Sequence, residues 1–323
     1  MFYEEGSMTK KLSLATLLFS LLFACSEQNF QTISSSQQAG ALAIYNNKVD
    51  ILWVVDNSSA TMERHQDRIA SFMGEFHSGL TRSGTDYHVA ASTMDMSSGG
   101  EDGELVESGL VVRSNTTNAV SKLQSLIQRG GEGNNFEVGL AAMKKTLEDA
   151  PSSFLRRDAL LVVVFITDDQ DVSVGPVSQY IQYLDSLKGE NSDEKQNWIT
   201  NFIGVTQLND PRCRTFGMYA GIGRRYIDLA NHSGGVVDTI CYTDFSSYMD
   251  QITARLQSVL NEFILKDKPL LSTISVTKNG SAVIQDEING WVYKKETNTI
   301  LLLGESKPTP KDKIEIKYEL SNE

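Results

Sequence analysis

The stretch Leu160-Leu161-Val162-Val163-Val164-Phe165-Ile166-Thr167-Asp168 decides the fold of this 323-residue chain. An uninterrupted apolar run rich in valine is typical of a strand that is buried on both faces of a sheet. A second run of this kind, Ile51-Leu52-Trp53-Val54-Val55, ends in Asp56. Such strands occur in parallel sheets that helices cover on both sides. The two runs therefore predict an α/β domain in which each strand leads into an aspartate.

The segments around these strands alternate between helical and extended patterns. Apolar residues recur at helical spacing from Met62 to Leu80 and in the ranges 120–127, 138–147, 177–187 and 226–230. Strand patterns occupy 87–93, 105–112, 201–205 and 236–240, and a last helical stripe runs from Tyr248 to Phe263. This alternation predicts a doubly wound, mostly parallel sheet. In such sheets ligands bind beyond the carboxyl ends of the strands.

The chain changes character at both ends of this pattern. Beyond Pro269 the helical period is lost, and short alternating strands at 274–276, 291–293, 299–303 and 314–318 are separated by turn residues such as Asn279-Gly280 and Asn289-Gly290. Residues 26–46 are rich in Ser and Gln and predict a tether. We therefore divide the chain into a signal at 1–25, the tether, an α/β domain at 47–266 and a small β module at 267–323.

The N-terminus predicts export. Met8-Thr9-Lys10-Lys11 is basic, and the apolar run that follows, residues 12–23, is too short to span a membrane as a mature helix. Its end, Leu22-Phe23-Ala24-Cys25, resembles a bacterial lipobox, which implies that Cys25 is lipidated and anchors the mature chain. Ser26 favours the outer membrane over the inner membrane. The alternative is a plain signal peptide or apolar anchor in which Cys25 has no role.

Charge and cysteine content limit the function classes. The net charge is −12 and the pI is near 4.9, which argues against a nucleic-acid partner and against an anionic membrane surface, because both need a basic face. Membrane contact is expected through the lipid anchor alone. In an oxidising compartment Cys213 and Cys241 predict one disulfide. The alternative is two buried free thiols.

Oxygen-bearing side chains gather in three segments. Asp56-Asn57-Ser58-Ser59-Ala60 follows the first strand, and Thr167-Asp168-Asp169-Gln170-Asp171 follows the strongest one. Between them, the glycine-rich stretch from Gly130 to Leu140 precedes a helix. Carboxylate, hydroxyl and amide oxygens suit hard cations such as Mg²⁺, Mn²⁺ or Ca²⁺. The sequence therefore predicts a divalent-cation site at the carboxyl edge of the sheet, with Mg²⁺ as the first choice.

These three segments, in this order, resemble the metal-ion-dependent adhesion site (MIDAS) of von Willebrand factor type A (VWA) domains, and the resemblance extends over residues 49–266. It implies that Asp56, Ser58 and Asp168 bind the ion and that Asn134 stands where the family has a threonine. The second serine of the DxSxS pattern is replaced by Ala60, whose methyl group cannot be a ligand.

Four further residues, Asn135, Glu137, Asp169 and Asp171, are candidates for supporting or substitute oxygen donors around those ligands. The alternative is a VWA fold whose site no longer binds an ion. Asp56 and Asp168 would then hold loops and helix starts only.

The resemblance implies a lipid-anchored binding or adhesion protein of the cell envelope. A protein ligand would complete the metal shell through an acidic residue. A second hypothesis is a metal-free scaffold or assembly lipoprotein with the same fold. A third is a metal-assisted hydrolase, but the sequence offers no identifiable general base or nucleophile, so we expect a protein that is not an enzyme.

Overall fold

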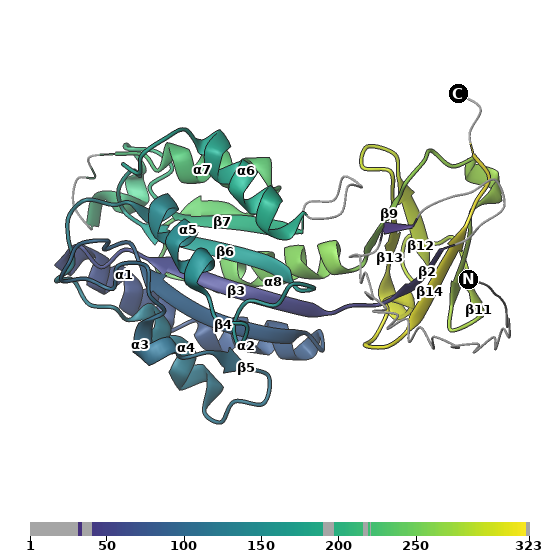
Figure 1. Cartoon of the computed structure of the whole chain (residues 1–323), viewed down its shortest axis with the longest axis horizontal. Helices are drawn as coiled ribbons and strands as arrows, with labels where there is room; N and C mark the ends of the chain where they lie inside the picture. Colours follow the sequence, from purple (N-terminus) through teal and green to yellow (C-terminus); the bar gives the residue numbers. More distant parts are fainter. Residues whose placement is uncertain (1–31, 34–40, 190–196, 216–218, 220, 321–323) are drawn as a thin grey trace, which may run out of the picture.

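The computed structural model describes residues 32–33, 41–189, 197–215, 219 and 221–320. Two parts lie along the longest axis of the molecule, a larger α/β domain and a smaller β module (Figure 1). The predictions for the signal segment 1–25 and for Cys25 concern residues outside the described ranges. Within the described residues, no helix has both the length and the apolar character needed to cross a membrane.

A six-stranded sheet forms the centre of the α/β domain. Its strand order is β5-β4-β3-β6-β7-β8. The strands are β3 (Lys48–Val55), β4 (Asp86–Thr93), β5 (Val112–Arg113), β6 (Leu160–Thr167), β7 (Trp198–Gly204) and β8 (Val237–Thr239). Neighbouring strands are parallel except for the antiparallel pair β4 and β5. The predicted doubly wound, mostly parallel sheet is therefore confirmed.

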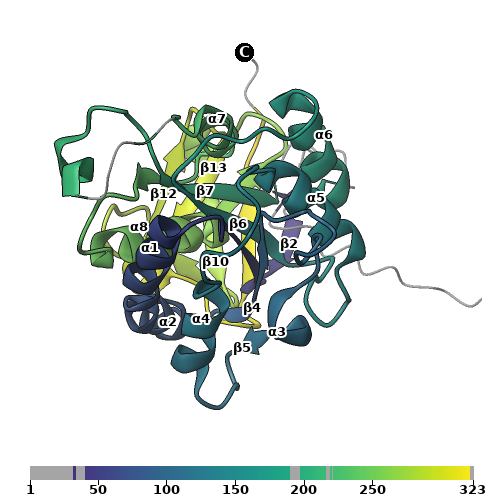
Figure 2. The ribbon, with the colours of Figure 1, turned by 90° about the vertical axis from the view of Figure 1, so that its left-hand side faces the viewer.

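Helices cover both faces of this sheet (Figure 2). One face carries α1 (Ala60–Ala70), α2 (Met73–Arg82), α4 (Ala119–Ile127) and α8 (Ser246–Leu260), and the other carries α5 (Gly139–Asp149), α6 (Val177–Lys188) and α7 (Arg224–His232). Alternate residues of β3 serve the two cores: Ile51 and Trp53 pack with the first set, Leu52 and Val54 with the second. This is why the strand is apolar at every position.

Two sequence predictions in this domain were wrong in detail. The helix expected from Met62 to Leu80 is broken into α1 and α2, and the hydroxyl of Ser71 at the break donates to the Arg68 carbonyl. The strand expected at 105–112 is mostly absent. Glu107 and Ser108 have left-handed backbone angles (φ 53° and 54°) inside the short α3 (Val106–Gly109). A strand cannot continue through that conformation.

The β module consists of two four-stranded sheets. One has the order β1-β9-β13-β12 and the other β11-β10-β14-β2. The strands are β1 (Thr32–Ile33), β2 (Ala41–Ile44), β9 (Glu262–Leu265), β10 (Ser275–Lys278), β11 (Ser281–Val283), β12 (Trp291–Lys294), β13 (Thr299–Leu302) and β14 (Lys313–Lys317). The described part of the chain also contains the 3₁₀ turns η1 (Pro211–Thr215) in the α/β domain and η2 (Leu271–Thr273) and η3 (Gly304–Ser306) in the β module. The predicted β module is therefore present.

The β module contains strands that precede the α/β domain in the sequence as well as strands that follow it. Strand β2 pairs with β14 although it lies in the range 26–46 that we interpreted as a tether. The last helix ends at Leu260, and Phe263 lies in β9, which pairs with β13. Both boundaries were therefore misplaced. Pairing partners far along the chain decide these two segments, and local composition does not show them.

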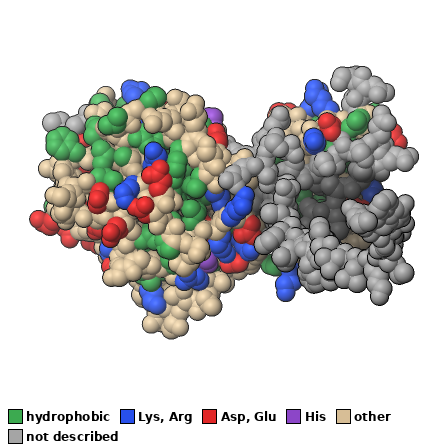
Figure 3. Space-filling view, viewed as in Figure 1, with side chains coloured by type: hydrophobic (Ala, Val, Ile, Leu, Met, Phe, Trp, Pro, Cys, Tyr) green, Lys and Arg blue, Asp and Glu red, His purple; other side chains and the backbone are tan. Residues whose placement is uncertain are grey.

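The chain passes between the two parts next to the amino ends of the parallel strands, since β2 leads into β3 (Figure 1). Acidic and basic side chains gather on the surface there (Figure 3). At the opposite edge, the disulfide between Cys213 and Cys241 is formed as predicted. It ties the loop after β7 to the segment just after β8 across a separation of 28 residues. By the chain-entropy estimate, closing a loop of this length adds about 3.6 kcal/mol of stability.

Candidate functional site

The two strand-terminal aspartates lie side by side because β3 and β6 are neighbours, with Val55 opposite Ile166. Asp56 is fully buried at the end of β3. Its backbone N–H donates to the carbonyl of Ile166 at 2.9 Å. Its Oδ2 accepts a hydrogen bond of 2.7 Å from the Thr167 hydroxyl. Thr167, the residue before Asp168, therefore fixes the orientation of the Asp56 carboxylate.

Ser58 turns back toward Asp56. Its backbone N–H donates to Asp56 Oδ1 at 2.8 Å, and its side chain lies close enough to the carboxyl groups of Asp56 and Glu137 to lower the pKa of both. Ser59 caps α1 by accepting from the Met62 N–H at 3.1 Å. The helix cap is therefore Ser59 and not Asp56, which removes one structural role that the sequence left open for Asp56.

A buried glutamine, which sequence reasoning missed, fastens the glycine-rich loop to this strand end. Gln66 Nε2 donates to the carbonyls of Asp56 at 2.7 Å and Gly130 at 2.8 Å. Its Oε1 accepts from the Arg129 N–H at 2.6 Å. A signal for it existed: Gln66 lies four residues after Met62, on the buried stripe of α1, where it and His65 are the polar members.

Two glycines of the loop allow close approach of backbone to the site. A Cβ on Gly131 would lie 2.5 Å from the carbonyl group of Ser59, and a Cβ on Gly133 would lie 2.5 Å from the Asn57 side chain. The Gly133 N–H donates to the Asn57 carbonyl at 2.8 Å. At Gly131 a side chain would push the loop away from the backbone of Ser59, whereas at Gly133 it would displace the Asn57 side chain.

Glu137 is a second buried carboxyl group of this site, beside Asp56. Only 3 % of its surface is exposed, and its Oε1 has no hydrogen-bond partner. Burial, followed by the charge of Asp56, raises the pKa of Glu137 to about 9. Burial and Asp56 likewise raise the pKa of Asp168 to about 7, and burial raises the pKa of Asp56. Three carboxyl groups therefore lie close enough to disfavour one another's ionisation.

A bound cation would stabilise the ionised forms of Asp56, Glu137 and Asp168. Asp56, Glu137 and Asp168 make no ion pair with any described Lys, Arg or His. Among the residues that the structure describes, no three His, Cys, Asp or Glu side chains are placed to hold a metal by themselves. An ion here would thus need Ser58 and water besides the carboxylates, as hard cations accept. The donor set fits a small divalent cation on that condition.

Three other predicted site residues, Asn134, Asn135 and Asp169, lie on the loops around this cluster. Asn134 is exposed, and its Oδ1 accepts from the Phe136 N–H at 3.0 Å within its own loop. Asn135 is also exposed. Asp169 lies near enough to Glu137 and Asp168 to raise the pKa of both.

Asp171 has a different role. Its Oδ1 accepts from the Leu140 N–H at 3.1 Å and from the Ser173 hydroxyl at 2.7 Å. Its Oδ2 forms an ion pair with Arg225 at 3.2 Å. Asp171 therefore ties the loop after β6 to the start of α5 and to α7, so its supporting role is structural.

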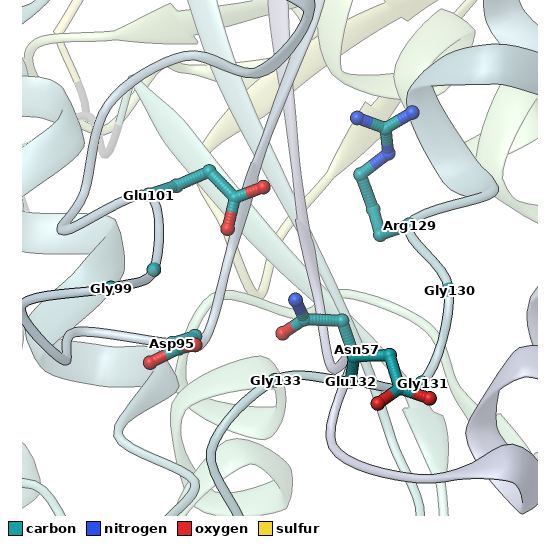
Figure 4. Close-up of a pocket in the computed structure, with 10 residues that line it drawn as sticks. Asn57, Asp95, Gly99, Glu101, Arg129, Gly130, Gly131, Glu132 and Gly133 are labelled. Atoms are coloured by element: carbon teal, nitrogen blue, oxygen red, sulfur yellow. The ribbon is translucent and has the colours of Figure 1, made fainter.

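A polar pocket of about 380 Å³ opens beside Asn57 (Figure 4). Its walls come from the end of β3, the loop after β4 and the glycine-rich loop, with Asn57, Asp95, Gly99, Gly100, Glu101 and Arg129–Gly133 as lining residues. Asp95 accepts from the Ser97 and Asn134 N–H groups, and Glu101 accepts from Thr93. Asp95 therefore joins the loop after β4 to the glycine-rich loop, and Glu101 is held at the end of β4.

Solved structures similar to the chain include proximal thread matrix protein 1 of the mussel byssus with a zinc-occupied MIDAS motif (15 % identity, TM-score 0.40, 72 % of this chain and 52 % of that one). They also include a von Willebrand factor type A protein from Catenulispora acidiphila (12 %, TM-score 0.38, 91 % and 64 %). A third is the pilus adhesin SpaC from Lactobacillus rhamnosus GG (10 %, TM-score 0.40, 87 % and 42 %).

These likenesses concern the fold alone, and the chain spans between 42 % and 64 % of the three solved chains. No curated protein matches the sequence. The profile of the von Willebrand factor type A domain matches residues 50–224, which is more than half of the chain. Together with the doubly wound sheet and the aspartates that end β3 and β6, this match establishes that the chain belongs to the von Willebrand factor type A domain family.

Proposed function

We propose that this chain is a lipid-anchored binding protein of the cell envelope that captures a protein ligand through a divalent cation at the carboxyl edge of its VWA domain. The observation that carries the proposal is Glu137. Beside Asp56 and Asp168, this buried carboxyl group has an oxygen without a hydrogen-bond partner and a pKa of about 9, so it keeps its proton at neutral pH unless a cation replaces that proton. Family membership supports the same site.

The ligands we assign are Asp56, Ser58 and Asp168, with Glu137 as the substitute donor for the hydroxyl lost at Ala60. Asn134 stays a candidate, since its amide oxygen has a second lone pair. Mg²⁺ is the first choice, with Mn²⁺ or Ca²⁺ as alternatives. The bound ion would offer a positive contact to an acidic residue of the ligand, because divalent cations accept several carboxylates in protein sites.

Calorimetric titration of the purified protein with each ion tests this proposal. We expect saturable binding in the wild type and none in Asp56→Ala. A matched control is Asp149→Ala, at the exposed end of α5, which should bind as the wild type does. Absence of binding heat and of a thermal shift with all three ions would refute the cation site.

The anchor is tested separately. Cys25→Ser should move the protein from the detergent phase to the aqueous phase in a phase-separation assay. Retention of the variant in the detergent phase would contradict lipidation at Cys25 and leave the cation site untouched.

A metal-free scaffold lipoprotein is the second candidate. Ala60 and the loop-bound oxygen of Asn134 favour it, because both weaken the coordination shell. Under this hypothesis Asp56→Ala leaves ligand capture from cell extract unchanged, with or without chelator. Under the first hypothesis both treatments abolish capture. Turnover of esters, phosphates or peptides that Asp168→Asn abolishes would instead support the hydrolase hypothesis, which we do not favour.

A further inference from the structure

The polar pocket beside Asn57 is separate from the proposed cation site, because none of the cation ligands assigned above lines it. Its volume is about 380 Å³, and the described residues that line it are either polar or glycine. Pockets for small organic groups begin at about 300 Å³. An apolar occupant would leave the polar groups of this wall without partners. The lining therefore favours a polar or charged occupant.

The side chain of Asn57 lacks a partner inside this pocket. Only 8 % of the residue is exposed, and Figure 4 shows its amide directed into the space between the loop after β4 and the glycine-rich loop. Within the described ranges this amide forms no hydrogen bond, although an amide has two donors and an acceptor oxygen. A ligand that bonds to it would remove the cost of leaving these groups unpaired.

Three carboxylates make the pocket negatively charged. Asp95, Glu101 and Glu132 line it, and none of them forms an ion pair with a described Lys, Arg or His. Arg129 lines it as well, but Glu107 offsets the charge of Arg129 through an ion pair of 2.7 Å. A cationic group is therefore the occupant that the charges of this pocket favour.

The three carboxylates are spread around the wall. Asp95 and Glu101 belong to the loop after β4, and Glu132 belongs to the glycine-rich loop (Figure 4). In the part of the chain that the structure describes, no three acidic side chains converge closely enough to hold a metal ion. An ammonium group is also compact, whereas a guanidinium is planar and presents five N–H donors in a fixed fork. Dispersed acceptors therefore fit a guanidinium better.

Two glycines leave room around the acceptors. A Cβ on Gly100 would lie 2.3 Å from the carboxyl carbon of Asp95, and one on Gly133 would lie 2.5 Å from the Asn57 amide. A side chain at either position would displace these groups. The Asp95 carboxylate also accepts from two backbone N–H groups, which fix it and stabilise its ionised form. Part of the acceptor set is thus preformed.

We propose that this pocket binds a guanidinium group, with Glu101 and Glu132 supplying the counter-charge and the Asn57 amide oxygen accepting a hydrogen bond. The proposal goes beyond the cation site and does not require an ion. Free arginine derivatives and an arginine side chain of a protein ligand present the same donors, so the experiment has to separate these two sources.

Calorimetric titration of the purified full chain with arginine amide, at low ionic strength and with chelator present, tests the pocket. We expect saturable binding with a dissociation constant on the order of 1 mM, as suits a ligand of this size. Citrulline amide, in which a neutral urea group replaces the guanidinium, should bind at least about 10-fold more weakly. Lysine amide should also bind more weakly than arginine amide, because its ammonium is compact.

A tripeptide with both ends blocked and arginine between two glycines distinguishes the sources. Binding of this peptide supports recognition of an arginine side chain in a protein ligand. Binding of arginine amide alone supports a free small molecule as the natural occupant.

Variants locate the binding. Glu101→Gln should weaken binding of arginine amide about 10-fold, and Glu132→Gln about threefold, because Glu132 is exposed and its charge is more screened. The matched control is Glu104→Gln, an exposed carboxylate of the same loop that does not line the pocket, which should bind as the wild type does. Each variant should keep the circular dichroism spectrum of the wild type.

Three results would overturn the proposal. These are equal affinities for arginine amide and either citrulline or lysine amide, no binding of arginine amide or the peptide, and wild-type affinity in both Glu101→Gln and Glu132→Gln. None of them affects the ion titration that tests the cation site.

Discussion

Strand β3 carries one buried aspartate near each end, and the two have opposite surroundings. Asp50, near the amino end, accepts from the Arg156 N–H at 2.5 Å and from Arg156 Nε at 2.8 Å. Asp56, at the carboxyl end, accepts from Thr167 and Ser58, which are neutral. Both side chains are fully buried.

This difference shows at which end of β3 the protein lacks a counter-charge of its own for buried carboxyl groups. At Asp50 the chain supplies its own counter-charge, since Arg156 also donates to the carbonyls of Val49 and Asp86 at 3.0 and 2.9 Å. At Asp56 two more carboxyl groups, Glu137 and Asp168, lie nearby without a described cationic partner. We infer that the first centre serves stability and the second serves binding.

The largest expected effect comes from removing Arg156, the cationic partner of Asp50. Arg156→Met leaves Asp50 buried without its counter-charge and should lower the free energy of unfolding by about 3–5 kcal/mol. Asp56→Asn should change it by less than about 1 kcal/mol in chelator, because it relieves repulsion among carboxylates. Urea unfolding of both variants measures the contrast. Equal losses would show that the two centres are both structural.

Low pH should destabilise the α/β domain, because His65 beside the carboxyl edge of the sheet would then have to bind a proton. This residue of α1 is fully buried and contacts the Tyr219 hydroxyl at 2.9 Å. Burial lowers its pKa from 6.5 to about 4. The unfolded chain therefore binds more protons between these two values, so the stability that His65 contributes is complete above pH 6.5 and is lost as pH falls toward 4. The total loss is about 3 kcal/mol.

The measurement is the difference in unfolding free energy between wild type and His65→Gln at pH 7 and pH 4. The wild type should lose about 3 kcal/mol relative to the variant over this range. A difference that does not vary with pH would mean that the pKa of His65 is the same in the folded and the unfolded chain.

Divalent cations should stabilise the wild type through the site at the carboxyl end of β3, and the centre at Asp50, near the amino end of β3, should not take part. At a free ion concentration about 100 times the dissociation constant, the gain is roughly 2.7 kcal/mol. Glu137→Gln should reduce this gain, whereas Asp50→Asn should keep it in full although it lowers the baseline. Thermal unfolding with and without chelator provides the comparison. A gain that Asp50→Asn removes would place the ion at the wrong end of β3.

The smallest effect is expected from restoring the lost hydroxyl. Ala60 is exposed at the first position of α1, so Ala60→Ser should fold normally. If it adds a ligand, ion affinity should rise by up to about fivefold, or about 1 kcal/mol. Ala60→Gly is the matched control and should not raise affinity. An unchanged affinity in Ala60→Ser would show that Glu137 already fills that position.

The sequence by itself determined the central sheet, the aspartates that end β3 and β6, and the disulfide between Cys213 and Cys241. Apolar runs at Ile51–Val55 and Leu160–Ile166 specify strands buried on both faces, whatever surrounds them. Order along the chain then brings Asp56 and Asp168 to the same edge, because parallel strands end on the same side. Local chemistry therefore predicted this half of the site.

Only the tertiary structure decided the rest. The orphan oxygen of Glu137, the clamp made by Gln66 and the structural use of Asp171 depend on which side chains meet across distant loops. Strands β2 and β9 likewise depend on their partners β14 and β13. A carboxylate has the same formula in a turn and in a core, and its free energy is set by the charges and donors that folding places around it.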